Sequence, residues 1–337
     1  MERVCGLKVS SKILLLGAGA AVAGITAAGA AALGSTQYLM KVALDRQMPP
    51  LPNMEKTRSK LCGGMMAEAF FQKLSAAAEK LETTPHTTVQ MQSYDGQTLV
   101  GHWFACKEPK RVIVAMHGWR SGWSSDFGII SDFWRKNGCS VLYAEQRGQG
   151  SSGGAYMGFG MMERHDCLCW CRWVNSHTDS RIPIYLAGVS MGATTVLMAS
   201  DLALPANVRG IMADCGFTSA HDIWKHVAEK NLHLYYDVHS GVADILCRKR
   251  IAMTSRDCST EKSLKNCKIP VLLVHGTADR FVPVEMTYRN YQACAAPKYL
   301  LIVPGAEHGM SYFAEQNRYE QAVLEFWNAC ETEKIGR

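Results

Sequence analysis

The stretch YLAGVSMGATT, residues 185–195, places a serine between two glycines. The β-branched and aromatic residues of IPIYLAGV predict a strand before the serine, and the residues from Met191 onward favour a helix after it. Gly188, Ser190 and Gly192 therefore match a G-x-S-x-G turn, in which the serine has a strained backbone and the glycines prevent collisions. The first amides of the helix, with their partial positive charge, would lie beside the serine hydroxyl. An ordinary turn of small residues has the same letters, so the motif needs its structural context.

The composition is that of a globular protein, because 47% of the 337 residues are hydrophobic and 20% are charged. The formal net charge of +6 is small and no Lys/Arg run exceeds RKR at 248–250, which disfavours a nucleic-acid partner. The histidines and cysteines lack the paired spacing of a zinc site. We therefore predict neither a metal nor a cofactor.

The N-terminal segment differs from the rest of the chain. Ile13–Leu33 carries no charge and, at ~1.5 Å per residue, could cross a bilayer core of about 30 Å. Residues 1–45 are therefore predicted to hold a membrane anchor, while a cleaved signal peptide or a buried Ala/Gly-rich helix remains open. Residues 46–86 are predicted to form a Pro-rich linker and an amphipathic helix, and 87–337 the catalytic domain.

Two features disagree about the side of the membrane on which this domain lies. Arg3, Lys8 and Lys12 before the apolar segment outnumber Lys41 and Arg46 after it, which weakly favours an outside domain. The odd number of cysteines, 13, without a disulfide framework suits a reducing compartment. We predict a membrane-anchored protein with an extracytoplasmic catalytic domain and mostly reduced cysteines, with a secreted form as the alternative.

The chain from residue 87 predicts an α/β fold. TTVQMQSY and QTLVGHWFAC are joined at Asp95-Gly96 and predict a hairpin. Near-continuous apolar runs then alternate with segments long enough for helices, which is typical of a mostly parallel, twisted sheet flanked by helices. These runs are RVIVAMHG, CSVLYAEQ, IPIYLAGV, VRGIMADC, PVLLVHG and KYLLIVPG.

Further segments resemble the α/β-hydrolase superfamily over residues 87–330. HGW at 117–119 is similar to its oxyanion loop, and EQRGQGSSGG from Glu145 resembles its D-x-R-G-x-G-x-S segment, with Glu in place of Asp. ADCGFTS, HGTADRFVP and GAEHG resemble the ends of the sixth, seventh and eighth strands. Within the superfamily the chain is similar to membrane-anchored or secreted bacterial serine hydrolases related to serine aminopeptidases and acylaminoacyl-peptidase-like esterases.

Ser190, Asp279 and His308 are the predicted catalytic triad. A serine hydroxyl needs a histidine to take its proton, and the resulting imidazolium needs a carboxylate. Asp279 and His308 each follow a predicted strand, and the order Ser, Asp, His is that of α/β hydrolases. Asp214 and Glu307 are the rival acids.

The predicted oxyanion hole consists of the backbone amides of Met191, directly after the nucleophile, and of Trp119. Gly118 would let the Trp119 loop approach the substrate. Three cysteines at alternate positions of DCLCWCRW, residues 166–173, do not share a helix face and are predicted to pack in the core. Cys215 is predicted to pack behind the site.

The alternation of apolar runs with helix-length segments is interrupted at about 220–265 by charged and aromatic segments. The resemblance to the α/β-hydrolase superfamily implies a small helical cap here, inserted after the sixth strand. Its aromatic and apolar residues are the predicted substrate-binding residues, although helical spacing also fits the cap's own packing. They are Trp224, Leu232, Tyr235 and Tyr236.

The leading functional hypothesis is a cofactor-independent serine hydrolase that cleaves carboxylic esters through an acyl-enzyme. Peptidase, thioesterase or lipase activity is open within the same mechanism, so the partner is a small acyl ester or a peptide. A non-catalytic binding protein on the same scaffold is the hypothesis from another class. A histidine base predicts activity that rises from acid to neutral pH, with a midpoint near ~6.5 if the site perturbs it little.

Overall fold

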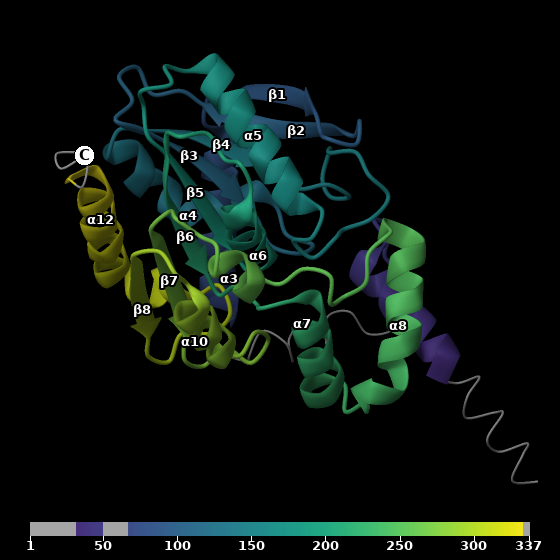
Figure 1. Ribbon diagram of the computed structural model, residues 1–337. Helices are drawn as coiled ribbons and strands as arrows, with labels where there is room; N and C mark the ends of the chain where they lie inside the picture. Colours follow the sequence, from purple (N-terminus) through teal and green to yellow (C-terminus); the bar gives the residue numbers. More distant parts are fainter. Residues whose placement is uncertain (1–31, 50–66, 333–337) are drawn as a thin grey trace, which may run out of the picture.

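The computed structural model describes residues 32–49 and 67–332. An eight-stranded sheet crosses the molecule in the order β1-β2-β4-β3-β5-β6-β7-β8 (Figure 1). β1 pairs antiparallel with β2, and β2 with β4, whereas the later pairs are parallel. The strands are β1 (Thr87–Gln92), β2 (Thr98–Phe104), β3 (Arg111–Met116), β4 (Cys139–Ala144), β5 (Ile184–Val189), β6 (Val208–Asp214), β7 (Val271–Gly276) and β8 (Lys298–Val303).

The central strands are apolar because helices cover both faces of the sheet. Every residue of β3, β4 and β7 is buried, as expected for a parallel sheet between two helical layers. This arrangement confirms the predicted α/β-hydrolase fold. The C-terminal ends of the parallel strands meet at one edge, where open α/β sheets place their sites.

Two apolar cores lie on opposite faces of the sheet. One contains side chains of α4 (Trp123–Lys136), α11 (Ser311–Ala314) and α12 (Gln316–Thr332). The other contains side chains of α5 (Glu163–His177), α6 (Met191–Met198), α9 (Thr260–Leu264) and α10 (Val284–Ala293). Helix α3 (Ala67–Thr83) lies against α4, where Ser124 Oγ donates to Glu82 (2.6 Å) and Lys80 pairs with Asp132.

The predicted cap lies between β6 and β7. It contains α7 (Ala220–His226), the π-helical turn η3 (Val227–Asn231) and α8 (Tyr236–Ile251), and α9 leads back to the sheet. The two ends of this insertion are tied together, because Thr260 N donates to Thr218 O (2.8 Å). The side chains that the cap turns toward the domain form a third apolar cluster with Met191 and Phe217.

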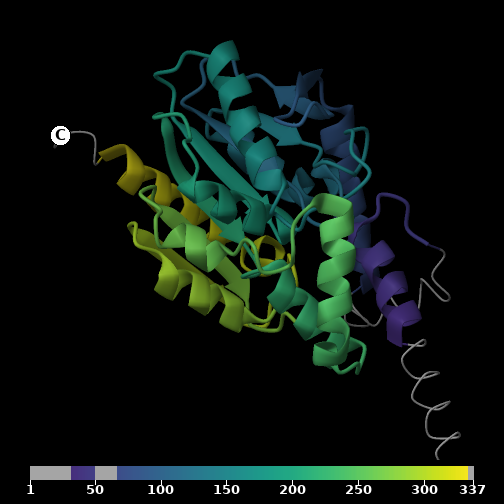
Figure 2. The same cartoon turned by 45° about the vertical axis from the view of Figure 1, so that its right-hand side comes forward.

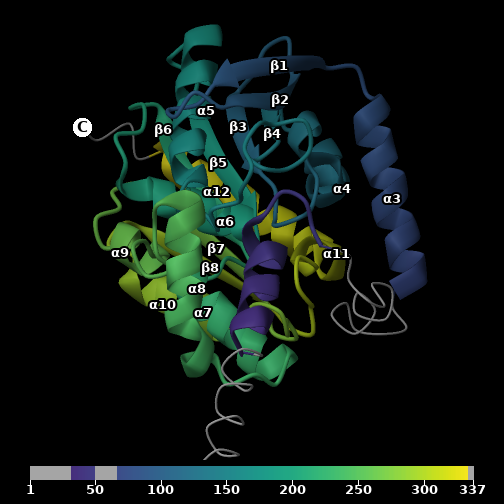
Figure 3. The same cartoon turned by 90° about the vertical axis from the view of Figure 1, so that its right-hand side faces the viewer.

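Residues 32–44 form a helix that lies alongside α8 in all three views (Figures 1, 2 and 3). Met40 and Leu44 are buried in the third apolar cluster, between the cap and the domain. Asp45 forms an ion pair with Arg250 of α8 (2.6 Å), and Thr36 Oγ1 lies 2.6 Å from His239 Nδ1. The end of the segment predicted as an anchor is therefore packed on the body of the protein.

Among residues 32–49 and 67–332, no helix is long and apolar enough to cross a membrane. The apolar segment predicted to be an anchor, Ile13–Leu33, lies outside the described residues except for its last two positions. The predicted membrane attachment therefore stays a prediction.

Candidate active site

Ser190 occupies the sharp turn between β5 and α6, near the centre of the sheet. Its φ of +55° is a strained conformation for a residue with a side chain, and the surrounding packing must enforce it. A Cβ added to Gly188 would overlap the backbone of Gly192, and a Cβ added to Gly192 would overlap the carbonyl oxygen of Met116. The two glycines are needed because strand, helix and the end of β3 come into backbone contact here.

His308 and Asp279 lie in the loops after β8 and β7 and complete a chain of hydrogen bonds from Ser190. Ser190 Oγ is 2.9 Å from His308 Nε2, and His308 Nδ1 is 2.7 Å from Asp279 Oδ2. Because a carboxylate only accepts, the proton between the last two groups belongs to Nδ1. His308 Nε2 is then free to accept the proton of Ser190. The structure thus brings together the three residues that were predicted as the triad.

Asp279 is held by more partners than His308. Its Oδ1 accepts the backbone amides of Phe281 (2.9 Å) and Val282 (2.8 Å). His275 Nε2 lies 3.1 Å from Oδ2, while its Nδ1 is 2.7 Å from Thr287 Oγ1. Burial alone would raise the pKa of Asp279, but His308 and His275 outweigh burial and hold this pKa well below its ordinary value. The carboxylate is therefore ionised at neutral pH.

The electrostatics of His308 favour its protonated form. Burial lowers the pKa of His308, but Cys215 and the Asp279 carboxylate raise it more strongly, and the net pKa lies well above that of an ordinary histidine. Burial raises the pKa of the Cys215 thiol to about 11. Because a thiol with this pKa is neutral at pH 7, only the part of the upward shift that comes from the Asp279 carboxylate acts at neutral pH, and Asp279 supplies the negative charge that stabilises the imidazolium.

Among the described residues, no hydrogen bond joins either rival acid to the ring of His308. Asp214 accepts the hydroxyl of Ser311 at its Oδ1 (3.0 Å), and burial raises the pKa of its carboxyl group. Its backbone oxygen accepts the amide of Ser190 (2.9 Å), so it supports the turn. Glu307 makes no hydrogen bond to the ring of its neighbour His308 among the described contacts.

The loop after β3 places backbone amides beside Ser190. A Cβ on Gly118 would lie 3.3 Å from the Cβ of Ser190. Gly118 N donates to Asp126 Oδ2 (2.6 Å), and Arg120 N donates to Gln149 Oε1 (2.5 Å). Between them, the amide of Trp119 binds no acceptor among the described residues, nor does that of Met191 at the start of α6. These two amides were the predicted oxyanion donors.

The four predicted substrate-binding residues lie in different environments. Trp224 is buried in the same apolar cluster as Met191, with its ring 5.3 Å from that of Phe159. Tyr236 is 3% exposed and packs within the cap against His221. Leu232 and Tyr235 are 43% and 68% exposed, which places them on the outer surface of the cap. Of the four, Trp224 shares an apolar cluster with Met191, and the role of all four in substrate binding stays a prediction.

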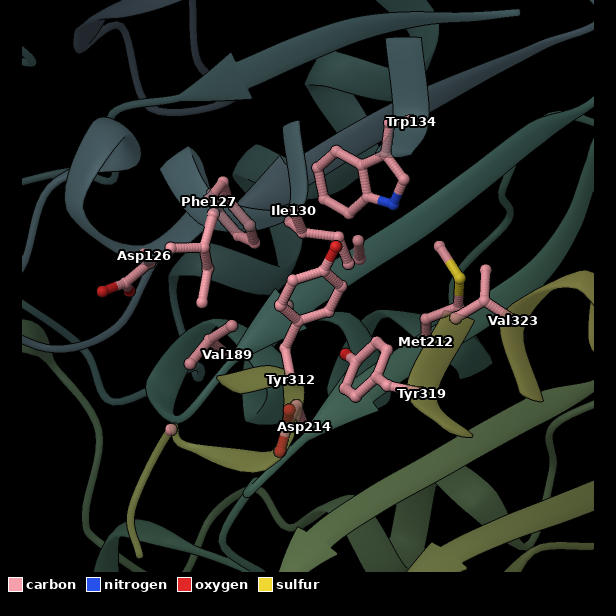
Figure 4. Close-up of a pocket in the computed structure, with 14 residues that line it drawn as sticks. Asp126, Phe127, Ile130, Trp134, Val189, Met212, Asp214, Tyr312, Tyr319 and Val323 are labelled. Carbon is pink, nitrogen blue, oxygen red and sulfur yellow. The ribbon is translucent and has the colours of Figure 1, made fainter. Parts of the chain in front are cut away.

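A small cavity lies between the sheet and helices α4 and α12, and Val189, which precedes Ser190, is among its lining residues (Figure 4). Figure 4 shows Trp134, Tyr312 and Tyr319 around it, with Asp214 at one end. Its volume of about 30 Å³ suits ordered water, whereas sites for drug-sized ligands measure ~300–1,000 Å³. At this volume the cavity can hold ordered water but not a drug-sized ligand.

The cysteines considered in the sequence analysis lie in two places. Cys167 and Cys171 are buried one helical turn apart on α5, in the core, and Cys169 between them is partly exposed. Cys215 lies beside the site, where its sulfur and the donor atoms of Asp279 and His308 are within 4.8 Å of one another. These residue types can bind zinc, but the side chains of His308 and Asp279 are hydrogen-bonded to each other and, through His308, to Ser190.

A family model matches residues 125–333, more than half of the chain, and this stretch includes Ser190, Asp279 and His308. The chain belongs to the prolyl oligopeptidase family. Membership of this family, on an α/β-hydrolase fold, makes the protein a serine hydrolase. The predicted resemblance to the superfamily is thereby confirmed, whereas its membrane-anchored aspect stays a prediction.

Several relatives of this prolyl oligopeptidase family member are similar in sequence or structure. The uncharacterized protein YqkD of Bacillus subtilis (strain 168) is 26% identical over 248 residues, which cover 74% of this chain and 81% of YqkD. The esterase Pf2001 of Pyrococcus furiosus has the same fold, with a TM-score of 0.60, 20% identity and coverage of 74% of this chain and 94% of the esterase. The acylaminoacyl peptidase of Pyrococcus horikoshii aligns with a TM-score of 0.54, 18% identity and coverage of 74% and 43%.

The sequence-based prediction missed several polar residues that hold the site in place. His275 lies four residues before Asp279, at the end of β7, and its position in the motif HGTAD was the available signal. Asp126 and Gln149 fix the loop that carries Trp119. No local pattern marks them, because their partners are backbone amides distant in the sequence.

Proposed function

We propose that this serine hydrolase cleaves carboxylic esters through an acyl-enzyme, with Ser190 as nucleophile, His308 as general base and Asp279 as the orienting acid. The observation that carries the proposal is the continuous hydrogen-bonded chain from Ser190 Oγ through His308 to Asp279 Oδ2. Such a chain activates a hydroxyl that is otherwise a weak nucleophile.

The reaction proceeds in two halves. His308 Nε2 takes the proton of Ser190 as Oγ attacks the ester carbonyl, and the imidazolium is stabilised by the Asp279 carboxylate. The same Nε2 proton passes to the departing alkoxide, which leaves as an alcohol, and Ser190 carries the acyl group. Water then loses a proton to His308 and attacks the acyl carbonyl. The bond to Ser190 Oγ breaks, Oγ takes the proton from His308 Nε2, and the carboxylic acid leaves, which restores both residues.

The amides of Trp119 and Met191 stabilise the negative charge that develops on the carbonyl oxygen. Preorganised donors of this kind contribute strongly, since the loss of one costs about 10²–10³ in kcat in a serine protease. Both amides are positioned by rigid neighbours, one at the start of α6 and the other between two residues whose own amides are bound.

An ester substrate with an apolar acyl group is supported by the surroundings of the triad. The cluster beside Ser190 contains Met191, Phe159, Phe217 and Trp224, and the ring of Phe281 lies 5.1 Å from that of His308. In addition, the alignment spans 94% of the Pyrococcus furiosus esterase but 43% of the acylaminoacyl peptidase. Much of that peptidase has no counterpart in the aligned region.

A substrate panel combined with a nucleophile variant tests this proposal. We expect turnover of p-nitrophenyl esters across a series of acyl chain lengths to exceed turnover of peptide anilides. Ser190→Ala should abolish both turnover and labelling by a fluorophosphonate, and Ser180→Ala, an exposed serine in a distant turn, should leave both unchanged. Substantial labelling of the Ser190→Ala protein would refute the nucleophile, and faster cleavage of anilides would make the protein a peptidase.

A further inference from the structure

The carbonyl groups of residues 42–46, at the end of the N-terminal helix (residues 32–44), are all bound by donors of the catalytic domain. Arg120 donates to Val42 O from Nε (3.1 Å) and Nη2 (2.8 Å), to Asp45 O from Nη2 (2.6 Å) and to Arg46 O from Nη1 (3.4 Å). The remaining carbonyls, of Ala43 and Leu44, accept the Trp119 indole N–H (2.9 Å) and Met157 N (2.7 Å).

The donors that bind the last carbonyl groups of this helix belong to the catalytic domain. The last four carbonyl groups of a helix lack partners within it, and they carry partial negative charge. Glycine caps and solvent usually satisfy them. Here the partners are the guanidinium of Arg120 and the indole of Trp119, which are adjacent residues of the loop beside Ser190. The end of the N-terminal helix and this loop therefore fix each other.

The backbone of the loop is under strain that this contact sustains. Arg120 has a φ of +51°, which a residue with a long side chain adopts only when its surroundings enforce it. Its amide is bound by Gln149 and its guanidinium by the helix end. The peptide N–H of Trp119 is thus held between Gly118, fixed by Asp126, and Arg120, fixed at both ends.

The N-terminal helix also contacts the neighbourhood of the second oxyanion amide. Met40 and Leu44 belong to the apolar cluster that contains Met191. The Asp45–Arg250 ion pair and the contact of Thr36 with His239 attach the same helix to the cap. One helix is therefore joined to the loop of Trp119, to the packing around Met191 and to α8.

We infer that Arg120 is a positioning residue of the oxyanion hole, which holds the Trp119 amide in its working direction by binding the carbonyl end of the N-terminal helix. This inference rests on the proposed function, because it assigns the Trp119 amide to the substrate carbonyl. Residues 32–46 are accordingly part of the active-site framework. Among the described residues, no hydrogen bond or ion pair joins Arg120 to the triad.

The test compares Arg120→Met, Arg120→Lys and a matched control in the full chain. Arg289→Met is the control, since Arg289 pairs with Asp222 (2.9 Å) and Glu261 (2.7 Å) and contacts neither the N-terminal helix nor the loop. For Arg120→Met we expect kcat on a p-nitrophenyl ester to fall ~10- to 100-fold, which is part of the loss for a deleted oxyanion donor. KM should change less than about threefold.

Further readouts separate positioning from a general loss of structure. Titration with a fluorophosphonate measures the concentration of enzyme whose active site reacts, and kcat is divided by that concentration. The pH midpoint of kcat/KM should be unchanged, because His308 and Asp279 do not contact Arg120. Arg120→Lys should recover only part of the lost kcat. Its ammonium group can still donate to the carbonyl groups of residues 42–46, but it can bind fewer of them than the guanidinium does. Arg289→Met should keep wild-type values throughout.

Amide hydrogen exchange gives a readout that does not need turnover. Exchange in residues 117–121 should rise in Arg120→Met and stay unchanged in Arg289→Met. The inference is overturned if kcat per labelled site stays within twofold, or if exchange in this loop does not change. Absence of wild-type labelling at Ser190 would refute the proposed function instead, and the exchange result would still decide whether the N-terminal helix holds the loop.

Discussion

Replacing Asp279 by asparagine tests which acid serves His308. Oδ1 of Asp279 accepts the amides of Phe281 and Val282, so an asparagine would keep its carbonyl oxygen there and turn its NH₂ group toward His308. An NH₂ group cannot accept the Nδ1 proton, so the imidazole proton moves to Nε2. In that tautomer Nε2 has no lone pair with which to take the proton of Ser190.

The size of the effect follows from this change of tautomer. The equivalent change in a serine protease triad lowers kcat about 10⁴-fold, which at ~1.36 kcal/mol per factor of ten is about 5 kcal/mol of transition-state stabilisation. Asp214→Asn is the matched control. Its Oδ1 accepts the hydroxyl of Ser311, and among the described residues no hydrogen bond joins it to His308. We therefore expect a decrease of less than about tenfold, the scale of one neutral hydrogen bond.

The assay is kcat on a p-nitrophenyl ester, with urea unfolding of each variant to confirm that it is folded. The assignment of the acid is refuted if Asp279→Asn retains activity within about tenfold of wild type. It is also refuted if Asp214→Asn is the more damaging of the two while both are folded.

Two other measurements test the electrostatics and the turn. Only the neutral imidazole of His308 can accept a proton, so the raised pKa of His308 places the pH midpoint of kcat/KM above ~6.5. The sequence analysis used ~6.5 because it assumed an unperturbed histidine. The midpoint should fall in Asp279→Asn, and a wild-type midpoint at or below 6.5 contradicts this. Gly192→Ala should destabilise the fold by about 3 kcal/mol or more, since its Cβ meets Met116 O. Gly241→Ala, with nothing within 4 Å on α8, should stabilise it by ~0.5–1 kcal/mol, and similar urea midpoints for the two variants would contradict the argument.

The central part of the fold is predictable because it depends on short stretches of sequence. Each buried parallel strand is an apolar run, and Ser190, Asp279 and His308 each follow one of them. Parallel strands bring their carboxyl ends to one edge, so chain order alone places these residues near one another. Their contact in the structure fits that expectation, and their catalytic roles remain a proposal.

The attachment of residues 32–46 could not be predicted, because it depends on contacts between distant parts of the chain. The apolar residues of this segment continue the uncharged stretch before it, which indicated an anchor and then a linker. In the structure Met40 and Leu44 face the cap and the domain, and Arg120 is 74–78 residues away in sequence from the carbonyls that it binds. Membrane attachment, orientation and a secreted form all stay predictions.

The substrate-binding residues show a different limit. Leu232 and Tyr235 were predicted from residue type and are largely exposed, whereas Phe159 and Phe217, from outside the cap, lie in the cluster with Met191. Which of these residues bind substrate stays a prediction. Composition alone does not tell which face of a short helix turns inward when the helices are separated by irregular turns. The π-helical turn at Val227–Asn231 shifts the direction of the residues that follow it.

The bond between Thr260 N and Thr218 O has a consequence for evolution and for protein engineering. It closes the cap into a module whose two ends meet, so the chain between them can lengthen, shorten or be exchanged without displacing β6 or β7. Substrate range can therefore change while the chemistry is preserved. Replacing the cap of this protein is subject to one condition. A transplanted cap must keep partners for Asp45 and Thr36, so we expect a successful exchange to replace the cap and the N-terminal helix together.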